Sequence, residues 1–491
     1  MRNTRLSDHT FKKGKFITPL NSISVTQELE DEKSWTYGRM PEYLWIGMIL
    51  KYFGREDGLK KTYDIISKLH QLSPELYTAR LSQILNLESS IQKRFYEYIT
   101  SIGGKEALAP LTIYLTTSRA PVFAEYFFCS EQSITDRRET VIQTMQEIMD
   151  HQSNEATDIR FVALYFNLLS GRVHLLKEQI DLLIQYPKAK HADEIMRMAR
   201  PTVRSLEMMI LTFEKTDSKY LRDFWRCVSE MTDCNIFSIA FPEEKRNITA
   251  YMEKVHDIFV YLSNLFTACD PLDEKMKVLL GIATYSYKRL KEIYDHNMFN
   301  SISGRSCVRV LIENYIMMKY LIKNETSHDN IWKDYQLYGL GLYKLVLARH
   351  RERGTSEESH FDEKYIEALV NEFKDEEFID MDTKYFDKQN IRLKAESVGE
   401  KELFGLYYDY DSSFEHGLWG AIRESSLLKC SNPAHQYHCV PDIDDDTRLK
   451  TVLPECVMVM NKTLSFLNDL YGIPEKLLSE VINCEIEFTT E

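Results

Sequence analysis

The sequence predicts an all-α, multi-helical protein of two helical domains or lobes, with no substantial sheet. Long segments carry apolar residues at three- and four-residue spacing, which is the pattern of amphipathic helices. The 491 residues include only 18 Gly and 13 Pro, few for the turns of a β-sandwich or barrel. No two alternating β-branched runs are joined by a tight glycine turn, so a sheet is not expected.

The helical pattern starts at Met40, where Pro41 and Glu42 suit the first turn of a helix. We expect helices in the N-terminal half within 40–72, 75–100, 106–116, 137–151, 156–170, 172–186, 190–214 and 213–235. In the C-terminal half we expect them at 243–268, 273–297, 302–323, 329–351, 362–375, near 403–428, and twice more at the C-terminus. The polar segments 351–360 and 382–402 read as loops, and 430–446 as irregular. This order suggests an N-terminal arm (1–38), an N-terminal helical domain (39–240) and a C-terminal helical domain (241–491).

The net charge and the absence of known motifs exclude several classes of function. With 61 Lys and Arg against 75 Asp and Glu, the formal charge is −14, which disfavours non-specific binding to phosphate backbones. RNA is therefore expected only through a local basic cleft. The sequence contains no Walker motif, dinucleotide fingerprint or HExxH, so ATPase, Rossmann and zincin functions are not indicated.

We expect a cytoplasmic protein that does not associate with a membrane. The first twenty residues lack the apolar core of a secretory signal, and the apolar run 43–50 is too short to span a bilayer. Nine scattered cysteines fit a reducing compartment better than a disulfide framework.

The segment 309–321, RVLIENYIMMKYL, is a nearly continuous apolar run that contains two charges. One helix side carries Arg305, Arg309, Glu313, Ile316 and Tyr320. A buried charge costs several kcal/mol unless it is paired. Because Arg precedes Glu, the less favourable order within a helix, we expect partners on other helices. The alternatives are a functional site and a structural ion pair that sets helix register.

The segment 407–425 places Asp409, Ser413, His416, Gly420 and Arg423 on one face of a single helix. An imidazole between these groups could be held in one tautomer, and Ser413 is close enough to be activated by it. The alternative is a half-buried histidine in a polar seam, since a Ser/His pair without a glycine elbow is a weak signal.

The segment 430–439, CSNPAHQYHC, holds Cys430, His435, His438 and Cys439. These residue types suit zinc, but zinc ligands usually come as two pairs a dozen or more residues apart. We therefore expect no metal and no cofactor, and a turn at Asn432-Pro433 that brings His435 towards the helix of His416.

These three segments, in this order, resemble a bacterial family catalogued as domain of unknown function 5677. The similarity covers roughly 255–445 and consists of an Arg-x-x-x-Glu helix, a Tyr…Ser…His-Gly helix that starts at Tyr410, and a Cys-x-Asn-Pro-x-His-x-x-His segment. Gln436 and Cys439 stand where the family often has basic residues. Residues 34–55 are similar to a Trp…Arg-x-Pro-Glu-x-Leu-Trp segment of longer members. The resemblance implies an all-helical fold and an association with anti-phage defence, and a distant HEPN relation is conceivable.

Two functions follow as alternatives. The first is a sensing or binding module for a protein or small ligand, with a buried Arg-Glu-His network. The second is a HEPN-like, metal-independent ribonuclease that uses Arg309 and His416; the literal Arg…His signature occurs only at Arg353 and His360. A hydrolase of another kind, using Ser413 and His416, is a third alternative, and a homo-oligomer stays open.

The site residues follow from these alternatives. The catalytic candidates are Arg309, Glu313, Ser413 and His416. We expect the side chains of Arg309, Glu313 and His416 to meet across a helix interface. Binding candidates are Arg305, Tyr320, Asp409, Tyr410, Arg423, His435 and His438.

Overall fold

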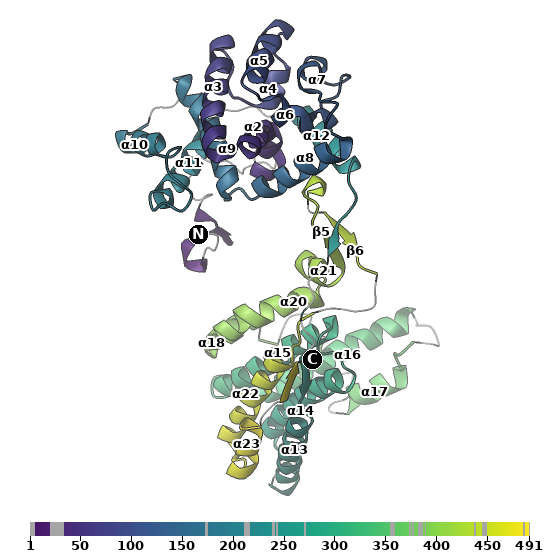
Figure 1. Cartoon of the computed structure of the whole chain (residues 1–491). Helices are drawn as coiled ribbons and strands as arrows, with labels where there is room; N and C mark the ends of the chain where they lie inside the picture. The colour runs from purple at the N-terminus through teal and green to yellow at the C-terminus, as the bar shows by residue number, and fades with distance from the viewer. Residues whose placement is uncertain are drawn as a thin grey trace. The chain divides into compact units, whose positions relative to one another are not determined.

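Helices dominate the computed structural model (Figure 1), and its strands form only small antiparallel sheets, which confirms the all-α prediction. Backbone contacts group the chain into two compact units. Unit 1 comprises residues 1–237 and 429–438, and unit 2 comprises 238–428 and 439–491. The structure describes residues 5–19, 34–171, 175–210, 217–237, 241, 244–269, 272–353, 359–372, 375, 378–381, 386–387, 389–436, 438–443, 449–484 and 487–490.

Unit 1 is built mainly from helices. They are η1 (Leu6–Asp8), the π-helix η3 (Trp35–Arg39), α2 (Met40–Phe53), α3 (Arg55–Leu72), α4 (Leu81–Leu85), α5 (Ser89–Ser101), α6 (Lys105–Leu108), η4 (Ala109–Ile113), α7 (Pro121–Phe127), α8 (Ile134–Met149), α9 (Asn154–Leu169), α10 (Lys177–Gln185), α11 (Met196–Ile210), α12 (Ser218–Glu230) and η8 (Pro433–His435). Short strands β1 (Thr10–Lys12) and β2 (Lys15–Ile17) form a hairpin, and β3 (Ile236–Phe237) pairs with the end of β5 (Leu427–Cys430).

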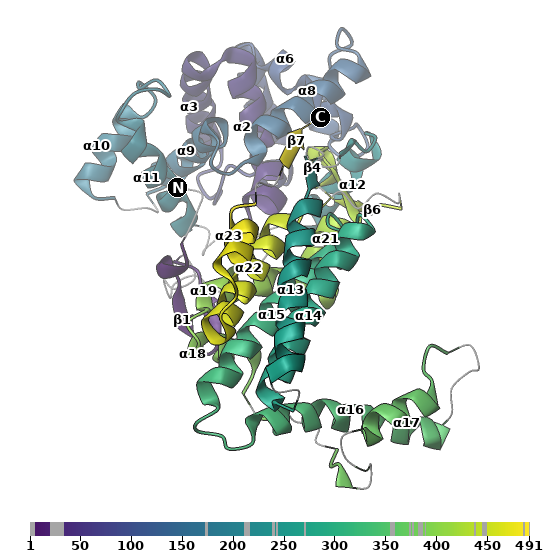
Figure 2. The ribbon, with the colours of Figure 1, turned by 90° about the horizontal axis from the view of Figure 1, so that it is seen from below.

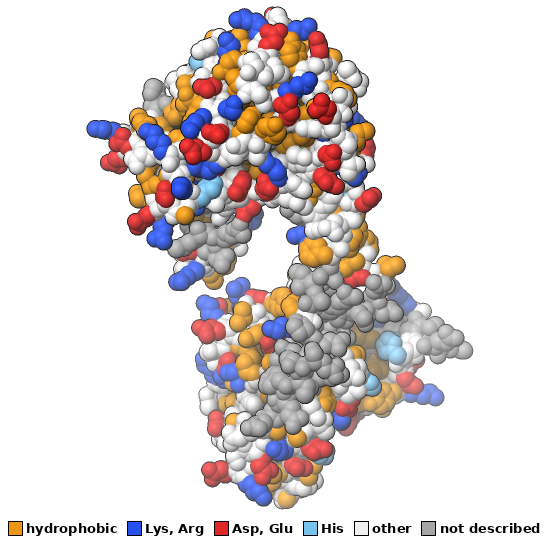
Figure 3. Space-filling model, in the orientation of Figure 1, with side chains coloured by type: hydrophobic (Ala, Val, Ile, Leu, Met, Phe, Trp, Pro, Cys, Tyr) orange, Lys and Arg blue, Asp and Glu red, His pale blue; other side chains and the backbone are white. Residues whose placement is uncertain are grey.

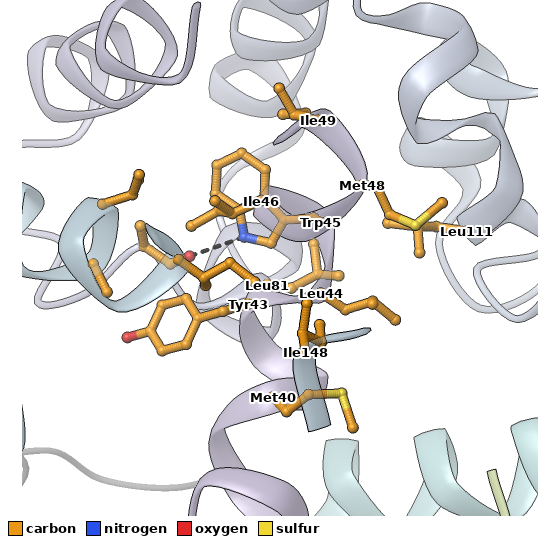
Figure 4. Packing of buried hydrophobic residues seen from close by; sticks show 14 of the residues in the cluster. Met40, Tyr43, Leu44, Trp45, Ile46, Met48, Ile49, Leu81, Leu111 and Ile148 are labelled. Carbon is orange, nitrogen blue, oxygen red and sulfur yellow. Dashed lines mark hydrogen bonds between the residues drawn. The ribbon is translucent and has the colours of Figure 1, made fainter. Parts of the chain in front are cut away.

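Helix α2 is the centre of the core of unit 1 (Figure 4). Every residue from Met40 to Ile49 is buried, because α3, α8 and α9 pack around it. The indole of Trp45 donates a hydrogen bond to the carbonyl of Ala79, 3.1 Å away. A helix that is apolar on all sides belongs in the interior of a large domain.

Buried charged side chains in α2 and beside it have hydrogen-bond partners on segments that are distant in the sequence. Glu207 on α11 accepts hydrogen bonds from Arg39, at 2.5 Å, and from Arg160, at 2.7 Å. Burial acts to raise the pKa of Glu207, but the two guanidiniums outweigh it and the pKa lies below its usual value. Glu42 accepts hydrogen bonds from both the backbone and the hydroxyl of Ser82, yet burial raises its pKa to about 7.

Unit 2 is a bundle of longer helices. They are α13 (Thr249–Cys269), α14 (Glu274–Asp295), α15 (Ile302–Asn324), α16 (Ile331–Arg353), α17 (Glu363–Asn371), α18 (Ile391–Ser397), α19 (Lys401–Leu403), the π-helix η7 (Phe404–Tyr408), α20 (Asp409–Glu415), α21 (Trp419–Ser425), α22 (Leu453–Tyr471) and α23 (Glu475–Ile482). Figure 2 shows α13, α14, α15, α22 and α23 side by side. Strands β4 (Glu244–Asn247) and β7 (Glu487–Thr490) pair antiparallel, and β6 is Cys439–Pro441.

The predicted helices agree with most of these elements, and the exceptions have local causes. The loop expected at 382–402 contains α18, which Asn390 caps by accepting a hydrogen bond from Leu393 N–H. The single helix expected at 403–428 is wrong, because a π-turn interrupts it at 404–408 and Gly417, with φ +57°, ends it. Residues 75–80 are not helical, although 75–100 was predicted as one helix.

A hairpin lies in the N-terminal arm, where no sheet was expected. Its turn residues Lys13 and Gly14 both have positive φ, which suits a two-residue hairpin turn. Parts of the predicted arm, of the loop 351–360 and of the irregular segment 430–446 lie outside the described residues.

The described helices include none that is long and apolar enough to cross a bilayer. On the face of unit 1 seen in Figure 3, acidic and basic side chains alternate, so that face presents no single-sign patch.

We predict that Glu207→Ala destabilises the protein by about 3–5 kcal/mol, because it leaves Arg39 and Arg160 buried without a counter-charge. The change is measured by denaturant unfolding followed by circular dichroism. Glu147→Ala is the control: its partner Lys51 lies 2.7 Å away, but the Glu147 side chain is 47% exposed. Glu147→Ala should lower the free energy of unfolding by at most about 1 kcal/mol. Equal losses in the two variants would show that the buried cluster is not what stabilises this core.

Candidate functional site

The two charges of the apolar helix α15 form a triangle with Tyr408. The guanidinium of Arg309 lies 3.5 Å from the carboxylate of Glu313 and donates a hydrogen bond to the Tyr408 hydroxyl at 3.2 Å. That hydroxyl in turn donates to Glu313, also at 3.2 Å. The guanidinium also stacks over the Tyr408 ring, 5.2 Å from its centroid. The Arg309–Glu313 pair therefore has a partner outside α15, and that partner is the hydroxyl of Tyr408, which is not a charged group.

Tyr408 reaches this position from the π-helix η7. A π-turn holds an extra residue and so changes the helix face on which later side chains emerge. Burial, followed by the nearby charge of Glu313, raises the pKa of Tyr408 to about 12, so the phenol stays protonated and donates. With both charges engaged by one hydroxyl, the triangle is a closed contact between α15 and η7.

One turn earlier on α15, Arg305 meets a buried carboxyl group. Its guanidinium lies 4.0 Å from Asp411, donates to the carbonyl of Lys450 at 3.1 Å, and faces the rings of Tyr410 and Phe414. Asp411 is only 2% exposed, and no described group donates a hydrogen bond to its Oδ1. Burial raises the pKa of Asp411 to about 7 in spite of Arg305.

Asp411, which was not among the candidates, is the buried carboxyl group of α20, one turn before the buried Phe414. Asp409, a binding candidate, is exposed. Tyr410, also a binding candidate, donates to Glu424 at 2.7 Å. Sequence spacing shows which residues share a helix face but not which side chains of another helix they meet, so it did not identify Asp411 or Tyr408.

His416 and its predicted neighbours do not share a helix face, which corrects that prediction. His416 is the exposed C-cap of α20, and the chain turns at Gly417 before α21 begins. Ser413 donates to the carbonyl of Tyr410, and Arg423 donates to the carbonyl of Leu427. Within the described parts of the chain, no hydrogen bond or ion pair joins the His416 ring to Arg309 or Glu313. Their meeting at one site stays a prediction.

The remaining candidate on α15, Tyr320, is a core residue. It is 4% exposed, and the ammonium of Lys394 lies 4.0 Å from its ring centroid. Lys394 is itself paired with Asp387. In the literal Arg…His signature, Arg353 and His360 are both exposed, and 354–358 between them lie outside the described residues.

His435 and His438 lie in unit 1, in a group with two cysteines. Cys234, Cys430, His435 and His438 each offer one ligand atom, and all four atoms lie within 4.8 Å of one another. Cys439 is not in the group. His435 does not turn towards His416, since its ring bonds to the carbonyls of Ser229 and Thr232 after α12. No spacing rule could identify Cys234, which is nearly two hundred residues before the others.

Three adjoining hollows lie along α14 in unit 2. The first is about 380 Å³ and is lined by Leu280, Gly281, Thr284, Tyr285 and Lys288 together with α13. The second, about 390 Å³, shares Gly281 and Tyr285 and adds Asn314 and Tyr335. The third, about 750 Å³, shares Tyr335 and adds Lys277, Tyr338, Tyr343 and Glu372. Burial, and then the charge of Glu313, raise the pKa of Tyr335 above its usual value.

By fold, the chain is an all-helical protein of two compact units. Residues 276–435 match the family described as Family of unknown function (DUF5677). This match confirms the family resemblance over the segment that runs from α14 to His435. No curated protein and no solved structure is significantly similar to the chain.

We predict that Asp411→Asn raises thermal stability more at about pH 8 than at about pH 5. A folded-state pKa of about 7, above the ordinary value of 3.8, means that the stability from protonated Asp411 is complete below about pH 4 and is lost as the pH rises through 7. Asparagine cannot ionise, so the melting-temperature gain should be at least roughly 2–4 °C larger at the higher pH. The exposed Asp409→Asn is the control and should show no such difference. An equal effect of Asp411→Asn at both pH values would contradict the burial of this carboxyl group.

Proposed function

We propose that the chain is a non-catalytic helical binding module, and that the open face of α14 is its recognition surface. The observation that carries this proposal is the row of hollows along one helix. Lys277, Gly281, Tyr285 and Lys288 recur at three- and four-residue spacing, so they share one face, and all four are exposed. The eleven helical steps from Lys277 to Lys288 correspond to about 16 Å of continuous surface.

The composition of this face supports binding. Gly281 has nothing within 4 Å of where a Cβ would stand, so the floor of the hollows is open backbone there. Tyr285 and Tyr335 line the same hollows as Gly281, and Tyr338 and Tyr343 line the adjoining third hollow. Tyrosine supplies a large apolar area with a polar tip, which is why it is enriched in interfaces. A surface with aromatic walls and a glycine floor is suited to a side chain that inserts deeply.

The occupant that fits best is an amphipathic segment of a protein partner. The hollows are open and arranged in a row, whereas a small-molecule pocket buries most of its ligand. Lys277 and Lys288 stand at the two ends of the face, so acidic residues flanking an apolar segment would complement it. This is the arrangement of helix-in-groove recognition. The family match begins at residue 276, so all of α14 from Met276 onward lies within the segment that matches DUF5677.

The ribonuclease alternative has less support. Arg309 is engaged with Glu313 and Tyr408, and His416 is an exposed helix cap without a described side-chain partner. General acid–base chemistry needs both groups within reach of one phosphodiester. The association with anti-phage defence that the resemblance implies stays a prediction, because no described contact bears on it.

We predict that a photo-crosslinking amino acid at position 285 captures a discrete protein partner in the cells that make the chain. The same amino acid at position 52 is the control, since Tyr52 in unit 1 is similarly exposed (54% against 55%). Adding Gly281→Leu should reduce the adduct at least about tenfold, because the side chain fills the floor. Leucine is also a better helix former than glycine, so loss of the adduct would not come from a weaker helix.

The same experiment contains the outcomes that would overturn the proposal. Gly420→Leu, at another helical glycine with open space around it, should leave the adduct unchanged. An adduct that survives Gly281→Leu, or that forms equally from position 52, would contradict recognition at α14.

A separate assay distinguishes the ribonuclease. We predict that purified protein leaves total RNA and tRNA intact with or without divalent metal. Cleavage that is lost in His416→Ala, with folding retained, would replace the binding module by the enzyme.

A further inference from the structure

Four metal-ligating side chains converge in unit 1, from two distant parts of the chain. Cys234 follows α12, and Cys430, His435 and His438 belong to the segment that returns to this unit at residues 429–438. Cys234 Sγ lies 3.2 Å from His438 Nε2 and 3.4 Å from His435 Nδ1. Cys430 Sγ lies 3.6 Å from the same Nδ1. Two sulfurs and two imidazole nitrogens thus face one another.

These separations match a tetrahedral zinc site. With zinc–sulfur bonds of about 2.3 Å and zinc–nitrogen bonds of about 2.0 Å, tetrahedral geometry puts a sulfur and a nitrogen ligand about 3.5 Å apart. The three sulfur–nitrogen distances, 3.2, 3.4 and 3.6 Å, lie close to this value. The other pairs are at most 4.8 Å apart, so small side-chain rotations complete the tetrahedron.

The second nitrogen of His435 is already occupied in the manner of a zinc ligand. Its Nε2 lies 2.9 Å from the carbonyl of Thr232 and 3.1 Å from that of Ser229, and carbonyls only accept. The Nε2 therefore carries the proton, which leaves the Nδ1 lone pair directed at Cys234 and Cys430. Zinc-bound histidines almost always donate their other N–H to a carbonyl or carboxylate.

The backbone of the return segment is held firmly around these ligands. Asn432 donates to the Thr232 hydroxyl and the Asp233 carbonyl, and Ala434 is part of the hydrophobic core. Gln436 has φ +55°, a strained value for a residue with a Cβ, and it reverses the chain between His435 and His438. The packing and backbone conformation of this segment therefore set the positions of its cysteine and histidine side chains without a bound ion.

We propose that Cys234, Cys430, His435 and His438 bind a zinc ion as a structural Cys2His2 site. Four protein ligands leave no open coordination position, which is the mark of structural rather than catalytic zinc. The ion would fasten the return segment 429–438 to the end of α12. Cys430 is fully buried, whereas Cys234 and His438 are exposed, so zinc can enter from solvent. The site explains why local spacing failed: three ligands lie within nine residues, and the fourth comes from another part of the chain.

The test is the metal content of the full-length protein, purified in reductant without chelator. We expect stoichiometric zinc by elemental analysis, and after cobalt substitution the absorption bands of tetrahedral, thiolate-bound cobalt. Cys234→Ser and the surface change His438→Ala should each weaken zinc binding at least about tenfold. Cys439→Ser is the matched control, since Cys439 is adjacent to His438 but outside the group. Circular dichroism verifies that each variant is folded.

Three results would overturn the proposal. The first is a reduced, folded wild-type protein that takes up no zinc or cobalt. The second is loss of metal from Cys439→Ser equal to that from Cys234→Ser. The third is a Cys234–Cys430 disulfide in the protein isolated from cells, because that bond would use both sulfur ligands.

Discussion

A charge cannot be buried in a helix without a partner, and this constraint organises both units. Arg39 and Arg160 share Glu207 in unit 1, and Arg305 and Arg309 meet Asp411 and Tyr408 in unit 2. Each contact joins segments far apart in the sequence. Arg309 is only half-buried, but the other charged groups are buried and would be unpaired if the helices packed in another register. The polar residues inside the apolar helices therefore select which helices pack together.

Much of the fold could be predicted because amphipathic periodicity is a local property. The positions of α13 to α16 follow from the apolar spacing of the sequence, because that spacing is set within each helix. The site was less predictable for a physical reason. The π-turn at 404–408 and Gly417 break the expected single helix, so His416, Gly420 and Arg423 do not continue the face of Asp409 and Ser413. Spacing at 3.6 residues per turn assumes one unbroken helix and cannot show such breaks.

Contacts over long sequence distances were beyond prediction for a different reason. The Arg-x-x-x-Glu pair could be recognised at once, but its partner Tyr408 is almost a hundred residues away. Likewise the local segment from Cys430 to Cys439 could not show that Cys439 lies outside the cluster of ligand-type side chains and that the distant Cys234 belongs to it. Local sequence shows that a polar group needs a partner, and only the tertiary structure identifies it.

In this account the charges of α15 stabilise the fold, and the proposed recognition surface is the neighbouring face of α14. The most direct test is a double-mutant cycle on Arg309→Met and Tyr408→Phe, with the free energy of unfolding as the measurement. We expect each single change to destabilise the protein and the pair to show a coupling of about 0.5–1.5 kcal/mol, since the two groups share hydrogen bonds. Variants that keep full stability and show no coupling would contradict a structural role for this cluster.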